Sequence, residues 1–416
     1  MKKHILLSAF ACDPIFGSDE EVGWQWALQL SQRGQDVTVI TRRSHKETIE
    51  NHIANTNQCL GVRFVYVDCD RLHSILSVFN RRNHIYYYIW QWLAYRVARN
   101  LHETESFDLV HHVTWVSFRQ PSFMGLLNIP MFFGPVAGGD EIPSGYTQTF
   151  SIKQRLVEKL RGFANLIVRF DPLMRSTFRQ ATQVFFTSEG HLKRVPDFVK
   201  KKAHIELAIG CDTNATNIVN PKINVNQEGS RLLFVGRCIA LKGMDLGLRI
   251  FAKVYREQPD VRLTIIGDGV DRERWMKSAE KLGIANAIEW RGWLSKEKVL
   301  ELYSEFDLLF YPSLRDSGGF VVLEALQRGL PVVCWRLGGP GVVVNNTCGA
   351  AIDASSNVEG SISRYADAVL NTLDRVRDDS TLSSACYVRA STFTWDALIE
   401  RIYGSILYVK EGKNES

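Results

Sequence analysis

The sequence predicts an α/β protein made of two Rossmann-like, doubly wound domains that face a cleft. Three observations lead to this fold class. The chain of 416 residues is longer than one typical domain, and its 45% apolar and 23% charged residues are ordinary for a globular protein. Short apolar runs also alternate with longer helical stretches along the chain, which is typical of parallel sheets covered by helices.

Short apolar runs predict strands in both halves, and the periodic segments of about 10 to 15 residues between them predict helices. The predicted strands of the first half are 4–10, 36–41, 62–67, 108–113, 130–134 and 183–187. Those of the second half are 231–236, 262–267, 288–292, 307–313 and 331–335. Each set predicts one parallel sheet.

A stretch rich in Asn, Thr and Gly, residues 210–230, marks the expected linker. We therefore expect an N-terminal domain at 1–209 and a C-terminal domain at 231–393. The segment 394–416 contains a helical pattern that we expect to cross back to the first domain. Its apolar residues fall broadly on one face: Trp395, Leu398, Ile399, Ile402 and Leu407.

The opening "MKKHILLSAFAC" resembles a short signal peptide, but the apolar run from Ile5 to Phe10 has strand length and turn residues follow it. We therefore favour a first sheet strand. No apolar run is long enough to span a bilayer. The eight cysteines form no CxxC pair and no Cys/His cluster at metal spacing, so we expect buried reduced thiols and a cytoplasmic location.

The net charge of +5 lies in the first half, where residues 1–200 carry 23 Lys and Arg against 18 Asp and Glu. Residues 71–99 contain five arginines and no acid, and 151–200 carry ten basic residues against four acidic ones. Basic stretches with aromatic residues suit an anionic membrane surface. A core helix with solvated arginines explains 71–99 equally well. Nucleic acid is a weaker partner, since no recognisable binding module accompanies the charge.

Glycines and polar residues follow the predicted strands of the second half. They occur at Gly236-Arg237, Gly267-Asp268-Gly269, Gly292, 313–319 and Gly338-Gly339. Ligands of open α/β sheets bind outside the carboxyl ends of the strands. These loops are therefore expected to form one edge that holds a ligand.

Two cations on this edge, Arg237 and Lys242, suit a diphosphate whose charge grows as it departs. They could equally be two solvated surface cations. The sequence has no GxxxxGK[ST] motif, and "GDG" at 267–269 is too short for GxGxxG, so nucleotide hydrolysis and dinucleotide binding lose support.

The stretch "SLRDSGGFVVLEALQRGLPVV" places Asp316 and Glu324 on either side of Gly318-Gly319. The glycines precede a helical run, so unpaired backbone N–H groups could bind an anion or a sugar hydroxyl. Two acids with bare amides fit a polyol joined to phosphate. Taken singly, Glu324 could be a helix-dipole carboxylate and Asp316 a loop cap.

Residues 231–344 resemble the carboxyl-terminal half of the family 4 glycosyltransferases, which are retaining enzymes of the GT-B fold. The family signature is two glutamates separated by seven residues, and this chain has Asp316 and Glu324 there. The resemblance implies that Asp316 faces the donor sugar, Glu324 the ribose hydroxyls, and Arg237 with Lys242 the diphosphate. The shorter Asp316 retracts its charge by one methylene, which puts sugar choice and the strength of that contact in question.

The loops around these residues are expected to bind the donor as well. The predicted donor-binding residues of the second half are Gly236, Gly267, Gly292, Trp293, Ser317, Gly318, Gly319 and Phe320. In the first half, "ACDPIFGSDEEVGWQWALQLSQRGQDVTVIT" is similar to the family's glycine loop and following helix, which implies that Gly17 and Ser18 lie across from the donor phosphates.

Two further segments of the first half resemble this family. "FDLVHHVTW" implies that His111 or His112 lies near the reacting sugar, although a histidine on an apolar strand is often a core residue. "FFGPVAGGDEIP" resembles a loop in the branch that builds bacterial surface polysaccharides. It implies an acceptor loop at Gly138, Gly139, Asp140 and Glu141.

The sequence therefore predicts transfer of a hexose from a nucleotide diphosphate sugar to a glycan or polyprenyl-diphosphate-linked acceptor, with retention of configuration. The resemblance implies bacterial exopolysaccharide, lipopolysaccharide or capsule synthesis, on the inner face of the cytoplasmic membrane. The resemblance implies that no metal or other cofactor is needed, because Arg237 and Lys242 stabilise the diphosphate, as a metal ion does in other glycosyltransferases. A nucleotide-sugar epimerase of the same fold and a non-catalytic nucleotide-sugar sensor are the alternatives. A glycosidase fits less well, because its mechanism uses a pair of carboxyl groups and gives Arg237 and Lys242 no role.

Overall fold

The computed structural model describes residues 2–15, 19–68, 84–211 and 229–407. The chain forms two compact units. The first comprises Met1–Gly139, Arg161–Ala208 and Leu398–Ser416, and the second comprises Asp140–Leu160 and Ile209–Ala397.

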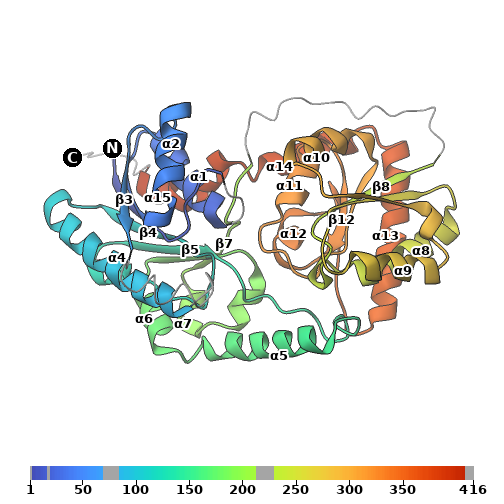
Figure 1. Ribbon diagram of the computed structural model, residues 1–416, viewed down its shortest axis with the longest axis horizontal. Helices are drawn as coiled ribbons and strands as arrows, with labels where there is room; N and C mark the ends of the chain where they lie inside the picture. The colour runs from blue at the N-terminus through green and yellow to red at the C-terminus, as the bar shows by residue number, and fades with distance from the viewer. Residues whose placement is uncertain (1, 16–18, 69–83, 212–228, 408–416) are drawn as a thin grey trace, which may run out of the picture. The chain divides into compact units, whose positions relative to one another are not determined.

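The first unit contains a seven-stranded sheet in the order β3-β2-β1-β4-β5-β6-β7, and its strand pairs are all parallel (Figure 1). The strands are β1 (His4–Ala9), β2 (Asp36–Arg42), β3 (Val62–Val67), β4 (Leu109–Thr114), β5 (Met131–Val136), β6 (Gln183–Phe186) and β7 (Ala203–Ile205). The helices of this part of the chain are α1 (Asp19–Gln32), α2 (Lys46–Thr56), α4 (His84–Glu105), α5 (Ile152–Ile167), α6 (Pro172–Gln180) and α7 (Asp197–Lys200).

The second unit contains a six-stranded parallel sheet in the order β10-β9-β8-β11-β12-β13. The strands are β8 (Arg231–Val235), β9 (Arg262–Ile266), β10 (Ile288–Gly292), β11 (Leu308–Tyr311), β12 (Val332–Trp335) and β13 (Gly349–Ile352). The helices are α8 (Met244–Glu257), α9 (Arg272–Lys281), α10 (Lys296–Leu302), α11 (Phe320–Leu326), α12 (Gly338–Val343), α13 (Val358–Asp378) and α14 (Leu382–Ser391). Helices α8, α9 and α13 group on one face of the sheet, and α11, α12 and α14 on the other (Figure 1).

The predicted fold class is confirmed: both sheets are parallel, Rossmann-like and covered by helices. Every strand predicted from an apolar run is present. The prediction missed β7 and β13, because β7 has only three residues and β13 reads GAAI, which lacks the bulky apolar residues that signal a strand.

The segment 140–160 was expected in the N-terminal domain, whereas the structure groups it with the second unit. Tyr146 packs its ring against Trp335 at 5.4 Å between centroids, and Glu158 forms a 2.5 Å ion pair with Arg315. Such contacts between distant parts of the sequence leave no local signal. Most of the predicted linker, residues 212–228, lies outside the described residues.

The last helix, α15 (Trp395–Leu407), belongs to the first unit from Leu398 onwards, as the predicted return of the chain requires. Tyr403 contacts His111, with 2.6 Å between the hydroxyl oxygen and Nδ1. Arg401 Nε donates to Glu206 Oε1 at 2.8 Å.

Helix α4 packs its aromatic face into the core of the first unit. Tyr87, Trp90, Ala94 and Ala98 are fully buried, and Trp90 Nε1 donates to the Val67 carbonyl at 2.9 Å. The part of the basic segment 71–99 that the structure describes is therefore a core helix. Residues 71–83 lie outside the described residues. Within the described part of the chain, no helix has both the length and the apolar character to cross a membrane.

Candidate functional site

A cluster of three polar side chains lies beyond two neighbouring strands of the second sheet. Lys242 precedes α8 in the loop after β8, Tyr311 ends β11, and Asp316 lies in the next loop. Lys242 Nζ donates to Asp316 Oδ2 and to the Tyr311 hydroxyl, each at 2.7 Å. Tyr311 in turn donates its hydroxyl proton to Asp316 Oδ2. Parallel pairing of β8 with β11 brings the two loops together.

The Asp316 carboxylate accepts four hydrogen bonds. Oδ2 takes those from Lys242 and Tyr311, while Oδ1 accepts from the Gly318 and Gly319 amides at 3.2 and 3.0 Å. An ionised carboxylate has about four lone-pair sites. The protein therefore fills the hydrogen-bonding capacity of Asp316 by itself.

The environment of Asp316 keeps it ionised. Burial, the largest single influence, would raise its pKa, but the Lys242 ammonium, the Tyr311 hydroxyl and the Gly319 amide outweigh burial and lower the pKa to about 2. The Asp316 and Lys242 side chains are only 18% and 16% exposed, so solvent screens this ion pair weakly.

The Gly318 and Gly319 amides are not bare, which corrects the prediction. They donate to Asp316 Oδ1, so Asp316 is the loop cap that the sequence left open as an alternative. Gly319 has φ +68°, a conformation that favours glycine, at the residue before α11.

Glu324 lies on α11, in contact with other residues than Asp316. Its Oε2 accepts from the Tyr303 hydroxyl at 3.2 Å, and its Oε1 lies 3.9 Å from Lys296 Nζ. The structure therefore places the two acids of the signature in two different polar clusters.

Arg237 does not join Lys242 in the structure, contrary to the prediction that both cations reach one point. Its side chain is exposed and makes no hydrogen bond or ion pair with the described residues. The backbone before Arg237 nevertheless lies close to Lys242, because a Cβ added to Gly236 would lie 3.6 Å from Lys242 Cε.

The glycines of the predicted donor loops have mainly a packing role in this structure. A Cβ at Gly267 would lie 2.0 Å from the Gly236 carbonyl oxygen, and one at Gly338 would lie 2.1 Å from the Asp316 carbonyl oxygen. Both residues therefore let neighbouring loops approach closely. Gly292 ends β10, and Trp293 after it is 76% exposed. Ser317 and Phe320 are half-buried beside Gly318 and Gly319.

His111 and His112 lie inside β4 and are wholly buried in the first unit. His111 Nδ1 contacts the Tyr403 hydroxyl, and Nε2 contacts the Gly134 carbonyl oxygen. Burial lowers the pKa of His111 to about 4, and burial together with His111 lowers the pKa of His112 to about 3. Both imidazoles are thus neutral at pH 7, and their surroundings favour a core role.

The structure does not bring the other predicted donor and acceptor residues of the first half together in one described cluster. Gly139 donates its amide to His191 Nε2 at 2.9 Å, and Arg161 donates to the Gly138 carbonyl at 2.9 Å. Asp140 and Glu141 follow in the second unit. Gly17 and Ser18 lie outside the described residues.

Sequence reasoning missed three polar residues, two beside the acids of the second unit and one in the first unit. Tyr311 and Tyr303 bond the two acids, and Asp19 begins α1, where burial and Glu20 raise its pKa to about 7. Tyr311 had a signal, since it is a hydroxyl-bearing residue at the carboxyl end of a predicted strand. Within the described residues, no three His, Cys, Asp or Glu side chains are grouped to hold a metal ion.

Residues 217–377 match a family described as "Glycosyl transferases group 1". This match contains Lys242, Tyr311, Asp316 and Glu324. It covers the carboxyl-terminal part of the chain only.

Curated relatives include D-inositol 3-phosphate glycosyltransferases. The one from Mycolicibacterium smegmatis is 32% identical over 178 residues, which are 41% of this chain and 38% of that protein. The one from Mycobacteroides abscessus is 24% identical over 397 residues, 92% of this chain and 82% of that protein. The chain matches only about two fifths of the length of the first curated relatives. These relatives are not named for surface polysaccharides, so that narrower prediction has no support from them.

Solved structures resemble nearly the whole chain. Anabaena Alr3699/HepE in complex with UDP has a TM-score of 0.60 and 15% identity, covering 97% of this chain and 99% of that one. WaaG, a glycosyltransferase involved in lipopolysaccharide biosynthesis, has a TM-score of 0.55 and 18% identity at the same coverage. At these identities the likeness shows the fold alone, and that fold is the GT-B fold.

Proposed function

We propose that this chain transfers a hexose from a nucleotide diphosphate sugar to a glycan or polyprenyl-diphosphate-linked acceptor, with retention of configuration. The observation that carries the proposal is the Lys242–Tyr311–Asp316 cluster beyond β8 and β11. It lies within the matched stretch 217–377 and at the sheet edge where such folds bind ligands.

Lys242 is the residue we assign to the leaving diphosphate. Its ammonium has three N–H donors, and the described residues engage two of them, through Asp316 and Tyr311. The third donor is available for a phosphate oxygen. A fixed cation stabilises a diphosphate most as its charge grows during departure, which is the condition for lowering the barrier.

Asp316 takes a different role from the one its place in the signature implies. Because its four acceptor sites are filled by Lys242, Tyr311 and two amides, it has none left for a sugar hydroxyl. We therefore assign Asp316 as a positioning residue that holds Lys242 and caps its own loop. Its contact with the donor is indirect.

Glu324, oriented by Tyr303, is assigned to the ribose hydroxyls of the donor. The exposed Arg237 is assigned to the diphosphate together with Lys242. We further propose that the reaction needs no metal ion and that the departing diphosphate accepts the proton of the acceptor hydroxyl. Residues 138–141 are assigned to an acceptor loop. A cytoplasmic location and a role in bacterial surface-glycan synthesis stay proposals as well.

The test is a two-step assay. UDP-, GDP- and dTDP-hexoses are screened for thermal stabilisation, because a ligand that binds the folded state raises the melting temperature. The stabilising donor is then incubated with and without glycan and polyprenyl-diphosphate acceptors. We expect acceptor-dependent release of the nucleoside diphosphate and a product with the donor's anomeric configuration by NMR.

The alternatives give different results in this assay. A changed sugar released without acceptor identifies an epimerase, and stabilisation without turnover identifies a sensor. Activity that EDTA abolishes and Mn²⁺ restores would contradict the role given to Lys242.

We also propose that α5 binds an anionic membrane surface. Its side chains Ile152, Leu156, Leu160 and Phe163 recur at helical spacing and are 80, 56, 60 and 63% exposed. The exposed cations Lys153, Arg155 and Lys159 lie among them. An apolar stripe with neighbouring cations is typical of helices that lie in a membrane interface.

Vesicle sedimentation tests this second proposal. The protein should sediment with vesicles that contain phosphatidylglycerol and stay in solution with pure phosphatidylcholine. Leu160→Ser and Phe163→Ser should reduce sedimentation, whereas Val388→Ser, at an exposed site on α14, should not. Equal sedimentation with both lipids, or by all variants, would refute the assignment of α5.

A further inference from the structure

A cavity lies at the edge of the second sheet opposite the Lys242–Tyr311–Asp316 cluster. Its volume of about 410 Å³ falls in the range of roughly 300–1,000 Å³ that small-molecule sites occupy. The lining residues Arg231, Asp307 and Pro331 stand at the amino ends of β8, β11 and β12. The cluster follows the carboxyl ends of β8 and β11, so the strands separate the two sites.

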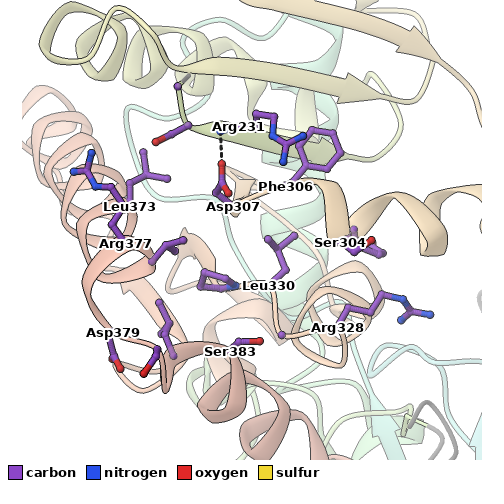
Figure 2. A pocket seen from close by; sticks show the side chains of 18 of the residues that line it. Arg231, Ser304, Phe306, Asp307, Arg328, Leu330, Leu373, Arg377, Asp379 and Ser383 are labelled. Atoms are coloured by element: carbon purple, nitrogen blue, oxygen red, sulfur yellow. Dashed lines mark hydrogen bonds between the residues drawn. The ribbon is translucent and has the colours of Figure 1, made fainter. Parts of the chain in front are cut away.

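Apolar side chains from several elements line the cavity (Figure 2). Leu373 and Val376 belong to the last turns of α13, and Leu382 begins α14. Phe306 precedes β11, and Leu330 precedes β12. Walls that converge from separate elements can bury the apolar body of an organic molecule.

One cation of the lining, Arg231, forms no close ion pair within the described part of the chain, although it interacts electrostatically with Asp307. The Arg231 side chain makes no hydrogen bond or ion pair with any described residue, while Arg377 pairs with Asp374 outside the lining. Figure 2 shows the Arg231 guanidinium beside the Phe306 ring. A guanidinium at the margin of an apolar wall suits an anionic group on the ligand.

Two acids of the lining accept hydrogen bonds from neighbouring donors. Asp379 accepts from the Thr381 amide and hydroxyl, and Asp307 Oδ2 accepts from the backbone amide of Arg231 at 2.7 Å (Figure 2). Burial raises the pKa of Asp307, although the Arg231 amide and the Arg231 charge act in the opposite direction. Asp260 is exposed. Arg231 is therefore the cation of the lining that can meet an anionic group on a ligand.

Two lining residues also contact Glu324. Tyr303 donates its hydroxyl to Glu324 Oε2 at 3.2 Å, and Arg328 Nη1 donates to the Glu324 carbonyl oxygen at 3.2 Å. The Arg328 guanidinium lies 5.8 Å from the centre of the Tyr303 ring. A ligand that moves Tyr303 or Arg328 therefore also moves the acid that we assign to the donor.

We propose that this cavity binds a small organic anion with an apolar body, and that its occupation changes the affinity of the donor site through Tyr303, Arg328 and Glu324. Coupling of this kind is reciprocal, so nucleotide must change the affinity for the anion by the same factor. The binding statement is independent of the proposed function. The coupling statement rests on the donor role of Glu324.

Isothermal titration calorimetry with naphthalene-1-sulfonate tests the binding statement. The probe has an aromatic body and one anionic group, and 1-naphthalenemethanol is its neutral counterpart. We expect one saturable site that prefers the sulfonate, and an affinity about tenfold lower for Arg231→Gln, which loses a charged partner. Val376→Trp, which fills the cavity from a half-buried wall, should abolish binding.

The matched control is Arg262→Gln, because Arg262 pairs in register with Arg231 but does not line this cavity. This variant should bind the sulfonate like the unmodified protein. Circular dichroism is measured for each variant to check that it is folded. Absence of a saturable site, equal affinity for the neutral probe, or full binding by Arg231→Gln and Val376→Trp would overturn the assignment.

A second titration tests the coupling. The dissociation constant of the stabilising nucleoside diphosphate is measured with and without saturating sulfonate. We expect a change of about threefold or more in the unmodified protein and none in Val376→Trp. An unchanged nucleotide affinity in the presence of bound sulfonate refutes the coupling, and leaves both the binding statement and the proposed transfer activity to stand on their own tests.

Discussion

In the second unit Asp316 lies in the loop beyond β11, whereas in the first unit His111 and His112 lie inside β4. Both groups stand towards the carboxyl ends of central parallel strands, and the sequence predicted a role in ligand binding for both. Asp316 is 18% exposed and pairs with Lys242, while His111 and His112 are fully buried among aromatic side chains.

The two regions also differ in whether neighbouring groups compensate the desolvation of their buried ionisable side chains. Lys242, Tyr311 and the Gly319 amide offset the desolvation of Asp316, so its pKa falls to about 2 and it stays charged. The histidines have no opposite charge beside them in the described residues, so desolvation lowers their pKa values to about 4 and 3 and keeps them neutral. An ionisable residue in the loop beyond a strand can keep its charge through loop donors, whereas one inside a covered strand is neutralised by desolvation.

The largest expected effect is that of Lys242→Met on transfer. Loss of a cation that stabilises the departing diphosphate should lower kcat/KM by about 100- to 1,000-fold. Lys277→Met, at an exposed position on α9, is the control and should stay within about twofold of the unmodified protein. Activity of Lys242→Met within threefold of the unmodified protein would remove Lys242 from the mechanism.

Asp316→Glu, which introduces the residue of the family signature, has the next largest expected effect. If Asp316 holds Lys242 and caps two amides, the longer side chain cannot keep all four bonds, and kcat/KM should fall about tenfold. If Asp316 were a sugar ligand retracted by one methylene, the same substitution would raise donor affinity. Donor KM and kcat measured by nucleoside diphosphate release decide between the two.

The histidine pair should appear in the pH dependence of stability instead of activity. Both pKa values lie below the ordinary 6.5, so the unfolded chain binds more protons than the native chain as the pH falls. The stability due to the neutral histidines is present above pH 6.5. It is lost between pH 6.5 and about 4 for His111 and between pH 6.5 and about 3 for His112, by roughly 1.4 kcal/mol per pH unit for each. Urea unfolding at pH 7, 6 and 5 measures the slope.

His112→Phe should reduce that slope by about one proton and leave the kinetics of transfer at pH 7 within about threefold. Phe133→Leu is the control, because Phe133 stacks on His112 at 5.0 Å and carries no proton. It should destabilise the protein without a change of slope. A loss of transfer in His112→Phe at unchanged stability would return this histidine to the active site.

The smallest expected effects are those of the tyrosine hydroxyls. Tyr311→Phe removes a bond to Asp316 and should lower kcat/KM about three- to tenfold, while Tyr303→Phe should mainly raise the donor KM by a few fold. Tyr365→Phe is the control, since its hydroxyl donates to the Val333 carbonyl in the same unit and to neither acid. It should affect stability only.

The sequence predicted those features that depend on local pattern. Apolar runs located the strands, and glycines after strands located the edge where Lys242 and Asp316 meet. Features that depend on side-chain geometry or on distant contacts were missed. The bond of Tyr311 to Asp316, the pairing of the Gly318 and Gly319 amides, and the grouping of 140–160 with the second unit belong to this class.

The histidines show a different reason why a prediction from sequence can fail. An alternating strand pattern does not say whether helices cover both faces of a strand, and in β4 every residue is buried. His111 is then enclosed by Tyr403 from α15, far along the chain. Only the assembled unit could show that these imidazoles belong to the core.

The most direct test of the role of Asp316 compares two ligands on one variant. The affinities of UDP and UDP-glucose, or of the stabilising nucleotide and its sugar, are measured by calorimetry for the unmodified protein and for Asp316→Asn. If Asp316 acts through Lys242 on the diphosphate, both affinities should fall by the same factor. Loss of affinity for the nucleotide sugar alone would mean that Asp316 contacts the sugar directly, and would contradict this account.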